Sequence, residues 1–132
     1  MARREAYGLY EETDKPFEAA LEATRAALKK RGFGILWEID VKATMKAKLG
    51  VDFTDYVILG ACNPPVAHQA LSAEPNIGLL LPCNVIVRKD GDGILLGAIS
   101  PHALMGLTGR EGLEPFADHV ASVLEKVLEA AR

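Results

Sequence analysis

The sequence has little that would mark a membrane, secreted or nucleic-acid-binding protein. Its longest apolar runs, residues 77–81 and 94–99, are far shorter than the roughly 20 residues that a membrane-spanning helix needs. No apolar stretch follows the first residues, so we expect no secretory signal. Basic residues do not outnumber acidic ones, at 15 against 18. A nucleic-acid-binding surface is normally basic, so we expect neither a nucleic acid nor a membrane as partner.

Cysteine is scarce, with Cys62 and Cys83 as the only two. Without a signal we expect a cytoplasmic protein, and in a reducing cytosol two cysteines are more often free thiols, ligands or catalysts than a disulfide. Their spacing matches no standard zinc or CxxC motif. Complete P-loop, GxSxG and HExxH motifs are missing, as is a GxGxxG after a strand. The motifs therefore assign no cofactor and no metal site.

What the sequence does have is the composition of an ordinary globular domain. Of its 132 residues, 49% are hydrophobic and 25% are charged, which excludes disorder and low complexity. A chain of this size buries about two thirds of its unfolded surface, enough for one core without disulfides. No internal repeat or linker divides the chain, so residues 1–132 are predicted to form one domain.

Apolar periodicity predicts two long helices with strands between them. Helices are predicted over 17–30, 41–49, 64–73 and 115–131, with Asp14, Asp40 and Asn63 as the caps of the first three. Strands are predicted over 5–10, 33–40 and 56–61, within an extended stretch over 77–87, and over 94–100. In 33–40, alternation places Phe33, Ile35, Trp37 and Ile39 on one face. The predicted fold class is α+β, an antiparallel sheet with two long helices.

The first candidate site is the segment from Gly60 to His68. Cys62 lies where a strand meets a helix N-terminus, and there free backbone N–H groups and the helix dipole favour a thiolate. Asn63 and His68 follow it at the start of the same helix. The alternative is that Cys62 is a small buried residue ahead of a capping Asn63, because free cysteine is among the most buried residue types.

The second candidate site is the segment from Leu79 to Val87. Pro82 cannot donate to a β-ladder, so it indicates an edge or a bulge. Alternation puts Cys83 and Asn84 on opposite faces of the strand. If Asn84 is buried, its amide needs a partner, either a neighbouring loop backbone or a ligand.

Cys-Asn therefore occurs twice, and the two pairs converge if their segments meet in space. With His68 or His102, such a cluster can bind a soft metal such as zinc or copper. Met105 lies three residues after His102, a spacing seen in some haem and copper sites and more often in ordinary packing. The sequence does not decide whether the two segments meet.

Four segments together resemble a known family: GFGI at 32–35, EIDV at 38–41, YVILGACNP at 56–64 and GLLLPCNV at 78–85. They resemble the Domain of Unknown Function 302 family of small bacterial and archaeal proteins, over nearly the whole chain. The resemblance implies a TATA-binding-protein-like fold in β-α-β(4)-α order and a homodimer, with further helical turns as insertions. It implies no activity, cofactor or catalytic residue, and it makes the two Cys-containing segments the family signature.

Three hypotheses for function follow from these features. The leading one is binding of a small molecule or metal ion at a site lined by Cys62, Asn63, His68, Cys83 and Asn84. The second is a thiol-dependent enzyme of sulfur transfer or redox chemistry, with Cys62 as nucleophile and His68 or His102 as base. The third is a non-catalytic dimeric module in which the signature segments build the fold or the interface.

Overall fold

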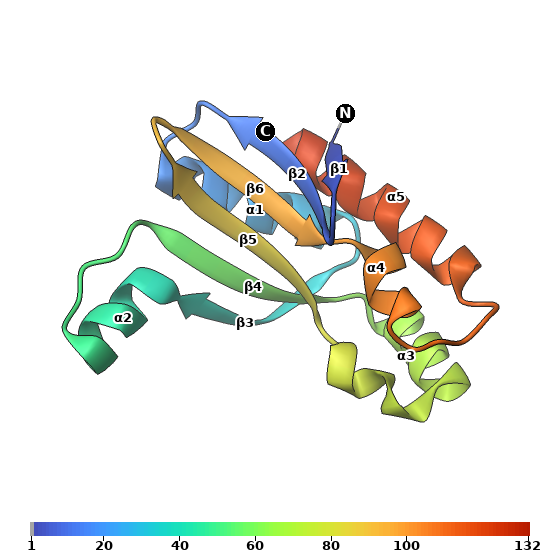
Figure 1. Cartoon of the computed structure of the whole chain (residues 1–132). Helices are drawn as coiled ribbons and strands as arrows, with labels where there is room; N and C mark the ends of the chain where they lie inside the picture. The colour runs from blue at the N-terminus through green and yellow to red at the C-terminus, as the bar shows by residue number, and fades with distance from the viewer. Residues whose placement is uncertain (1) are drawn as a thin grey trace.

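An antiparallel sheet of six strands organises the computed structural model, which describes residues 2–132 (Figure 1). Met1 lies outside the described residues. The strands are β1 (Arg3–Glu5), β2 (Gly8–Thr13), β3 (Gly34–Asp40), β4 (Tyr56–Cys62), β5 (Cys83–Asp90) and β6 (Gly93–Ile99). They lie in the order β1-β2-β6-β5-β4-β3, and every neighbouring pair is antiparallel. The predicted α+β class with an antiparallel sheet is confirmed.

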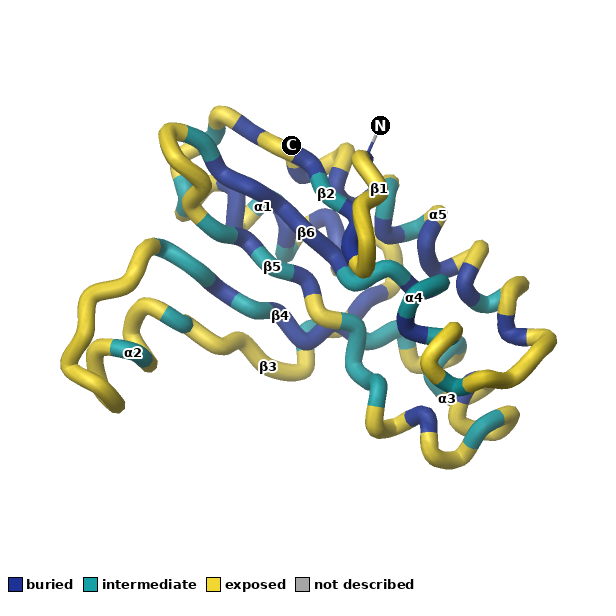
Figure 2. Tube along the Cα trace, in the orientation of Figure 1, coloured by how far each residue is buried: buried dark blue, intermediate teal, exposed yellow. Residues whose placement is uncertain are grey.

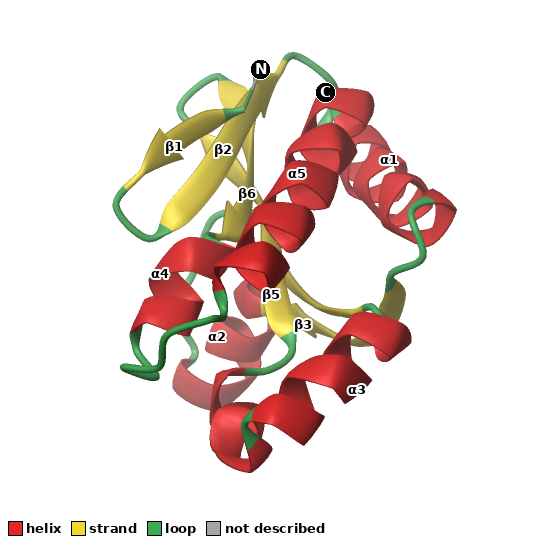
Figure 3. Cartoon of the chain, turned by 90° about the vertical axis from the view of Figure 1, so that its right-hand side faces the viewer, coloured by secondary structure: helices red, strands yellow, loops and turns green. Residues whose placement is uncertain are grey.

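Two long helices, α1 (Phe17–Lys30) and α5 (Glu114–Ala131), lie side by side on one face of the sheet (Figures 1 and 3). The connections carry α2 (Val41–Leu49), α3 (Pro64–Ala73), the 3-10 helix η1 (Pro75–Leu80) and α4 (Pro101–Gly106). Without these and β1, the order β2, α1, β3, β4, β5, β6, α5 fits the β-α-β(4)-α order that the resemblance implies. Among residues 2–132, no helix is long and apolar enough to cross a membrane.

Most of the burial lies between the sheet and the two long helices (Figure 2). Leu28 of α1 and Leu124 of α5 are fully buried in one cluster with Leu59 and Val85 of the sheet. Burying one such side chain contributes about 1.5–3 kcal/mol, so this interface supplies most of the hydrophobic stabilisation. The helical spacing of the apolar positions explains the fit of α1, whose buried residues are Ala20, Leu21, Thr24, Ala27 and Leu28.

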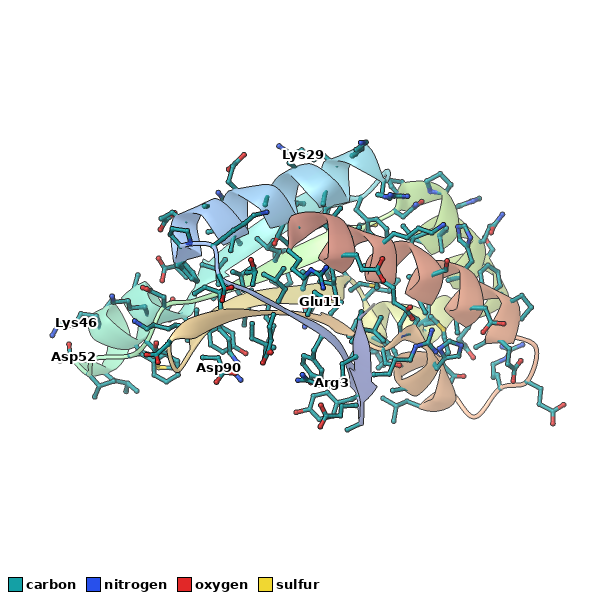
Figure 4. All side chains as sticks on the ribbon, turned by 90° about the horizontal axis from the view of Figure 1, so that it is seen from above. Arg3, Glu11, Lys29, Lys46, Asp52 and Asp90 are labelled. Atoms are coloured by element: carbon teal, nitrogen blue, oxygen red, sulfur yellow. The ribbon has the colours of Figure 1, made fainter. Side chains whose placement is uncertain are left out.

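The long helices leave the opposite face of the sheet open. We call this the free face; Figure 4 shows α1 and α5 on one side of the sheet and the side chain of Arg3 on the other. A groove of about 540 Å³ runs over it, with Tyr10, Tyr56, Asn84 and Arg88 among its lining residues. The face is therefore concave and mixes aromatic with polar side chains.

β3 is an edge strand that carries a β-bulge. Ile35 pairs with Ala61 and Trp37 pairs with Gly60, so Leu36 is the extra residue. The prediction that Ile35, Trp37 and Ile39 share one face is therefore wrong beyond Leu36, because the extra residue shifts the alternation by one. Ile35 packs against the core, whereas the Trp37 ring lies over Gly60 on the free face.

β3, α2 and the loop that follows form an arm, residues 34–53, which extends from the body of the molecule (Figures 1 and 2). No residue of β3 or α2 is buried. Leu36 is 61% exposed and Leu49 is 69% exposed. On the body side, Arg25 of α1 holds the arm by donating two hydrogen bonds to the Glu38 carboxylate, at 2.6 and 2.8 Å. Those hydrogen bonds lower the pKa of Glu38.

Several predicted elements are confirmed. The helices over 17–30, 41–49 and 64–73 have the predicted bounds, and the last helix begins one residue earlier, at Glu114. Asp40 caps α2, because its side chain accepts a hydrogen bond of 2.9 Å from the Ala43 N–H. Local signals of this kind lie within one turn of the chain, and tertiary packing does not override them here.

Other predictions are wrong in part. The expected single strand over 5–10 is split into β1 and β2 by a tight turn at Ala6, whose φ is +48°. The extended stretch over 77–87 begins instead with η1, and the strand starts at Cys83, in the middle of the sheet rather than at an edge. Asp14 does not cap α1, because Pro16 occupies the capping position and no side-chain bond is made there.

We expect Gly60→Ala to disturb the only tryptophan. A Cβ at this position lies 2.5 Å from the Trp37 indole, so the ring has to move. The expected result is a shifted fluorescence emission and a loss of about 1–3 kcal/mol in unfolding free energy, measured by urea denaturation. Gly34→Ala is the control, since its Cβ meets nothing closer than a carbonyl oxygen at 3.8 Å. Unchanged emission in Gly60→Ala would contradict the position of Trp37.

Candidate functional site

Cys62 and Cys83 line the same small cavity. β4 ends at Cys62, β5 begins at Cys83, and the antiparallel register places Ala61 opposite Cys83. Both thiols are free, and the cavity has a volume of about 40 Å³. We call it the dithiol cavity. It is lined by Phe33, Ala61, Cys62, Asn63, Val66, Ala67, Ala70, Leu81, Cys83, Pro101, Leu104, Met105 and Val120.

Two short helices complete the walls of the dithiol cavity. α3 begins directly after Cys62, because the Asn63 Oδ1 accepts a hydrogen bond of 3.4 Å from the Val66 N–H and proline follows at the first helical position. α4 begins in the same way at Ser100, whose Oγ accepts from the Ala103 N–H at 3.3 Å. Except for Asn63, the lining side chains are hydrocarbon or sulfur, so the cavity is apolar.

Burial sets the chemistry of Cys83. Burial, together with a smaller effect of the nearby Cys62 in the same direction, raises the pKa of this thiol from its ordinary value of 9.0 to about 11. Near neutral pH, Cys83 is therefore protonated and behaves as a small apolar residue. A ligand that binds its sulfur as thiolate has to displace the proton.

The five predicted site residues separate into two groups. Cys62, Asn63 and Cys83 lie together at the dithiol cavity. His68 is exposed on α3 and does not line it. Asn84 is exposed on the free face, where it lines the groove, so it is not the buried amide that would need a loop or a ligand as partner. The alternation along β5 explains this separation, because Cys83 and Asn84 point to opposite faces.

One of the two histidines predicted as a base for Cys62, His102, has another partner. The His102 Nε2 lies 2.6 Å from the Asp118 Oδ1, a contact that joins α4 to α5. His102 does not line the dithiol cavity, although its neighbours Pro101, Leu104 and Met105 do. Within residues 2–132, no hydrogen bond joins a cysteine to a histidine. The expected pair of Cys62 with a histidine base is therefore not seen among these residues.

The structure does not assemble a conventional metal site either. Over the described part of the chain, no three side chains of His, Cys, Asp or Glu gather closely enough to hold a metal ion. A structural zinc ion takes four such ligands, so the cysteines with His68 or His102 do not form a zinc site.

The sequence pattern does not indicate that Met105 lines the dithiol cavity. Its spacing from His102 suggested a pair, but the two side chains have different surroundings: Met105 lines the dithiol cavity and His102 contacts Asp118. The free-face groove was also missed. The signal for it was the alternation of the strands, which sets Tyr10, Tyr56 and Arg88 on the face opposite the core.

Comparison with known proteins identifies the family of this chain and a similar solved structure. Residues 10–131 match the family model described as "Domain of unknown function DUF302". The chain belongs to the DUF302 family. It is similar to the crystal structure of an uncharacterized conserved DUF302 protein from Bacillus stearothermophilus, with 28% identity and a TM-score of 0.91 over 97% of this chain and 100% of that one. No curated protein matches the chain. The resemblance seen in the sequence to DUF302 proteins is confirmed.

The raised pKa of Cys83 predicts how the rate at which its thiol is alkylated depends on pH. Only the thiolate is alkylated, so the rate in the folded protein should be low near neutral pH and should rise until about pH 11. In denaturant the same curve should level off about two pH units lower, near the ordinary value of 9.0. Iodoacetamide labelling with peptide mass mapping measures both curves. Equal curves in the folded and unfolded protein would contradict the burial of Cys83.

Proposed function

We propose that this DUF302 protein, folded as one domain, binds a small ligand in the dithiol cavity. The observation that carries the proposal is the convergence of Cys62, Asn63 and Cys83 on one apolar space. The two thiols come from strand ends far apart in the sequence, and neither is used in a disulfide. A pair of free thiols facing a cavity is a means of binding a thiophilic ligand, whereas a core needs only hydrocarbon there.

The volume limits what the ligand is. Roughly 10–15 Å³ of accessible volume is needed to hold one water molecule, so a cavity of about 40 Å³ holds an ion or a molecule of very few heavy atoms. Pockets for metabolites and drug-sized molecules are about 300–1,000 Å³. The proposal therefore excludes a metabolite-sized ligand in this cavity. It also includes a cytoplasmic location, because a reducing compartment keeps both thiols free.

A thiol enzyme is less well supported than a binding protein. Cys83 is held in its protonated form by burial, and neither His68 nor His102 lines the cavity beside Cys62. Nucleophilic catalysis by cysteine needs a thiolate and an adjacent base. Binding needs only that the two sulfurs reach the same ligand.

We also propose that the chain forms a homodimer through the arm. The supporting observation is the exposure of its apolar side chains: Leu36 at 61%, Leu49 at 69%, Val51 at 45% and Phe53 at 42%. An exposed edge strand invites pairing with another chain, and β3 is an edge strand. A second copy that covers the arm would bury this apolar surface.

Native mass spectrometry with elemental analysis tests the ligand proposal. The protein is purified under reducing conditions without chelator. We expect a bound ion or small mass that is lost after alkylation of the thiols and in Cys83→Ser, which changes one atom of the cavity wall. His68→Ala, an exposed change on α3 outside the cavity, is the control and should retain the ligand. A ligand-free mass would contradict the proposal and support a purely structural role for both cysteines.

Sedimentation velocity tests the dimer proposal. We expect the wild-type chain to sediment as a dimer and Leu49→Glu to shift it toward the monomer, because a charge cannot be buried at an apolar interface without a partner. The matched control is Leu107→Glu, which changes a leucine that is 76% exposed outside the arm. A monomeric wild type, or equal effects of both substitutions, would contradict an interface at the arm.

A further inference from the structure

Three sulfur-containing residues line the dithiol cavity. They are Cys62 at the end of β4, Cys83 at the start of β5 and Met105 on α4. The whole chain contains two cysteines and three methionines. Both cysteines and one methionine thus come from three separate elements to the same space of about 40 Å³.

The rest of the lining adds no competing metal ligand. No histidine or carboxylate lines the cavity, and the one polar side chain, Asn63, is engaged as the cap of α3. Thiolate and thioether sulfurs are soft donors, and they select soft ions. Zn²⁺ prefers four ligands and Mg²⁺ or Ca²⁺ prefer oxygen, so two thiols and a thioether suit neither class. Cu(I) is the soft ion that fits a small set of sulfur ligands alone.

From this sulfur set we infer that the dithiol cavity is a Cu(I) site. The Sγ atoms of Cys62 and Cys83 are its thiolate ligands, and the Met105 Sδ is a third, weaker thioether ligand. The inference rests on the proposed function, because it names the ligand of that same cavity.

The charge balance of the site is simple. One Cu⁺ replaces the protons of two thiols, which leave to solvent, and the bound group carries one negative charge. No electron is transferred, because copper enters and stays as Cu(I). The N-terminus of α3 begins next to Cys62, and its positive end offsets part of that negative charge.

Titration with Cu(I) tests the inference. The full chain is reduced, kept without oxygen and mixed with Cu(I) held by the coloured chelator bicinchoninate. We expect one Cu(I) to be withdrawn per chain, and X-ray absorption at the copper edge to show sulfur neighbours only. Cys62→Ser and Cys83→Ser should each abolish the withdrawal.

The third ligand has its own matched control. Met105→Leu should weaken Cu(I) binding by roughly tenfold or more, the scale seen when a supporting group is lost around a metal. Met45→Leu makes the same change on α2, outside the cavity, and should leave the affinity unchanged. Equal affinity of the two variants would overturn the assignment of Met105.

Two results would overturn the copper assignment itself: failure to withdraw Cu(I) from bicinchoninate, or nitrogen or oxygen neighbours in the absorption spectrum. The spectrum is recorded on the wild-type chain. It therefore identifies the atoms bound to copper even if a cysteine variant fails to fold. A different ion or small molecule found by native mass spectrometry, with no Cu(I) uptake, would overturn copper and leave the proposed function standing. If the protein binds neither Cu(I) nor another ion or small molecule, the copper assignment and the proposed function are both wrong.

Discussion

The structure depends on burying only one face of its sheet. α1 and α5 cover that face, and residues such as Leu59 and Val85 must point toward them. Because these residues face the helices, the alternation of side chains along each strand determines which face of the sheet each remaining side chain points to. Cys83 is thereby sent toward the helices and Asn84 toward the free face. A register shift of one residue in β5 would exchange the two and remove one thiol from the dithiol cavity.

The dithiol cavity lies where the insertions meet this core. Its floor is formed by the adjoining ends of β4 and β5, which belong to the β-α-β(4)-α order, whereas α3 and α4 are additions to that order. The long helices supply stability, and the short ones close the space over the thiols. The cavity is therefore built by additions to the core order, while the two long helices pack against the sheet.

Local signals predicted much of the fold and part of the site. The bounds of α1 and α2 and the caps Asp40 and Asn63 depend on neighbouring residues, so they could be read from the sequence. The bulge at Leu36 and the turn at Ala6 could not, because strand pairing creates them. The two Cys-Asn pairs are visible in the sequence, but only the folded structure lets both cysteines line one cavity at the adjoining ends of β4 and β5 and leaves Asn84 on the free face.

The central claim is that Cys62 and Cys83 form one binding site rather than two unrelated buried thiols. The most direct measurement is the shift in melting temperature on adding Cu(I), compared among the wild type, Cys62→Ser, Cys83→Ser and the double variant. A ligand that binds only the folded protein raises its melting temperature. We predict a clear rise for the wild type and none for any of the three variants. A wild type without a rise, or single variants that each keep part of it, would contradict a shared site.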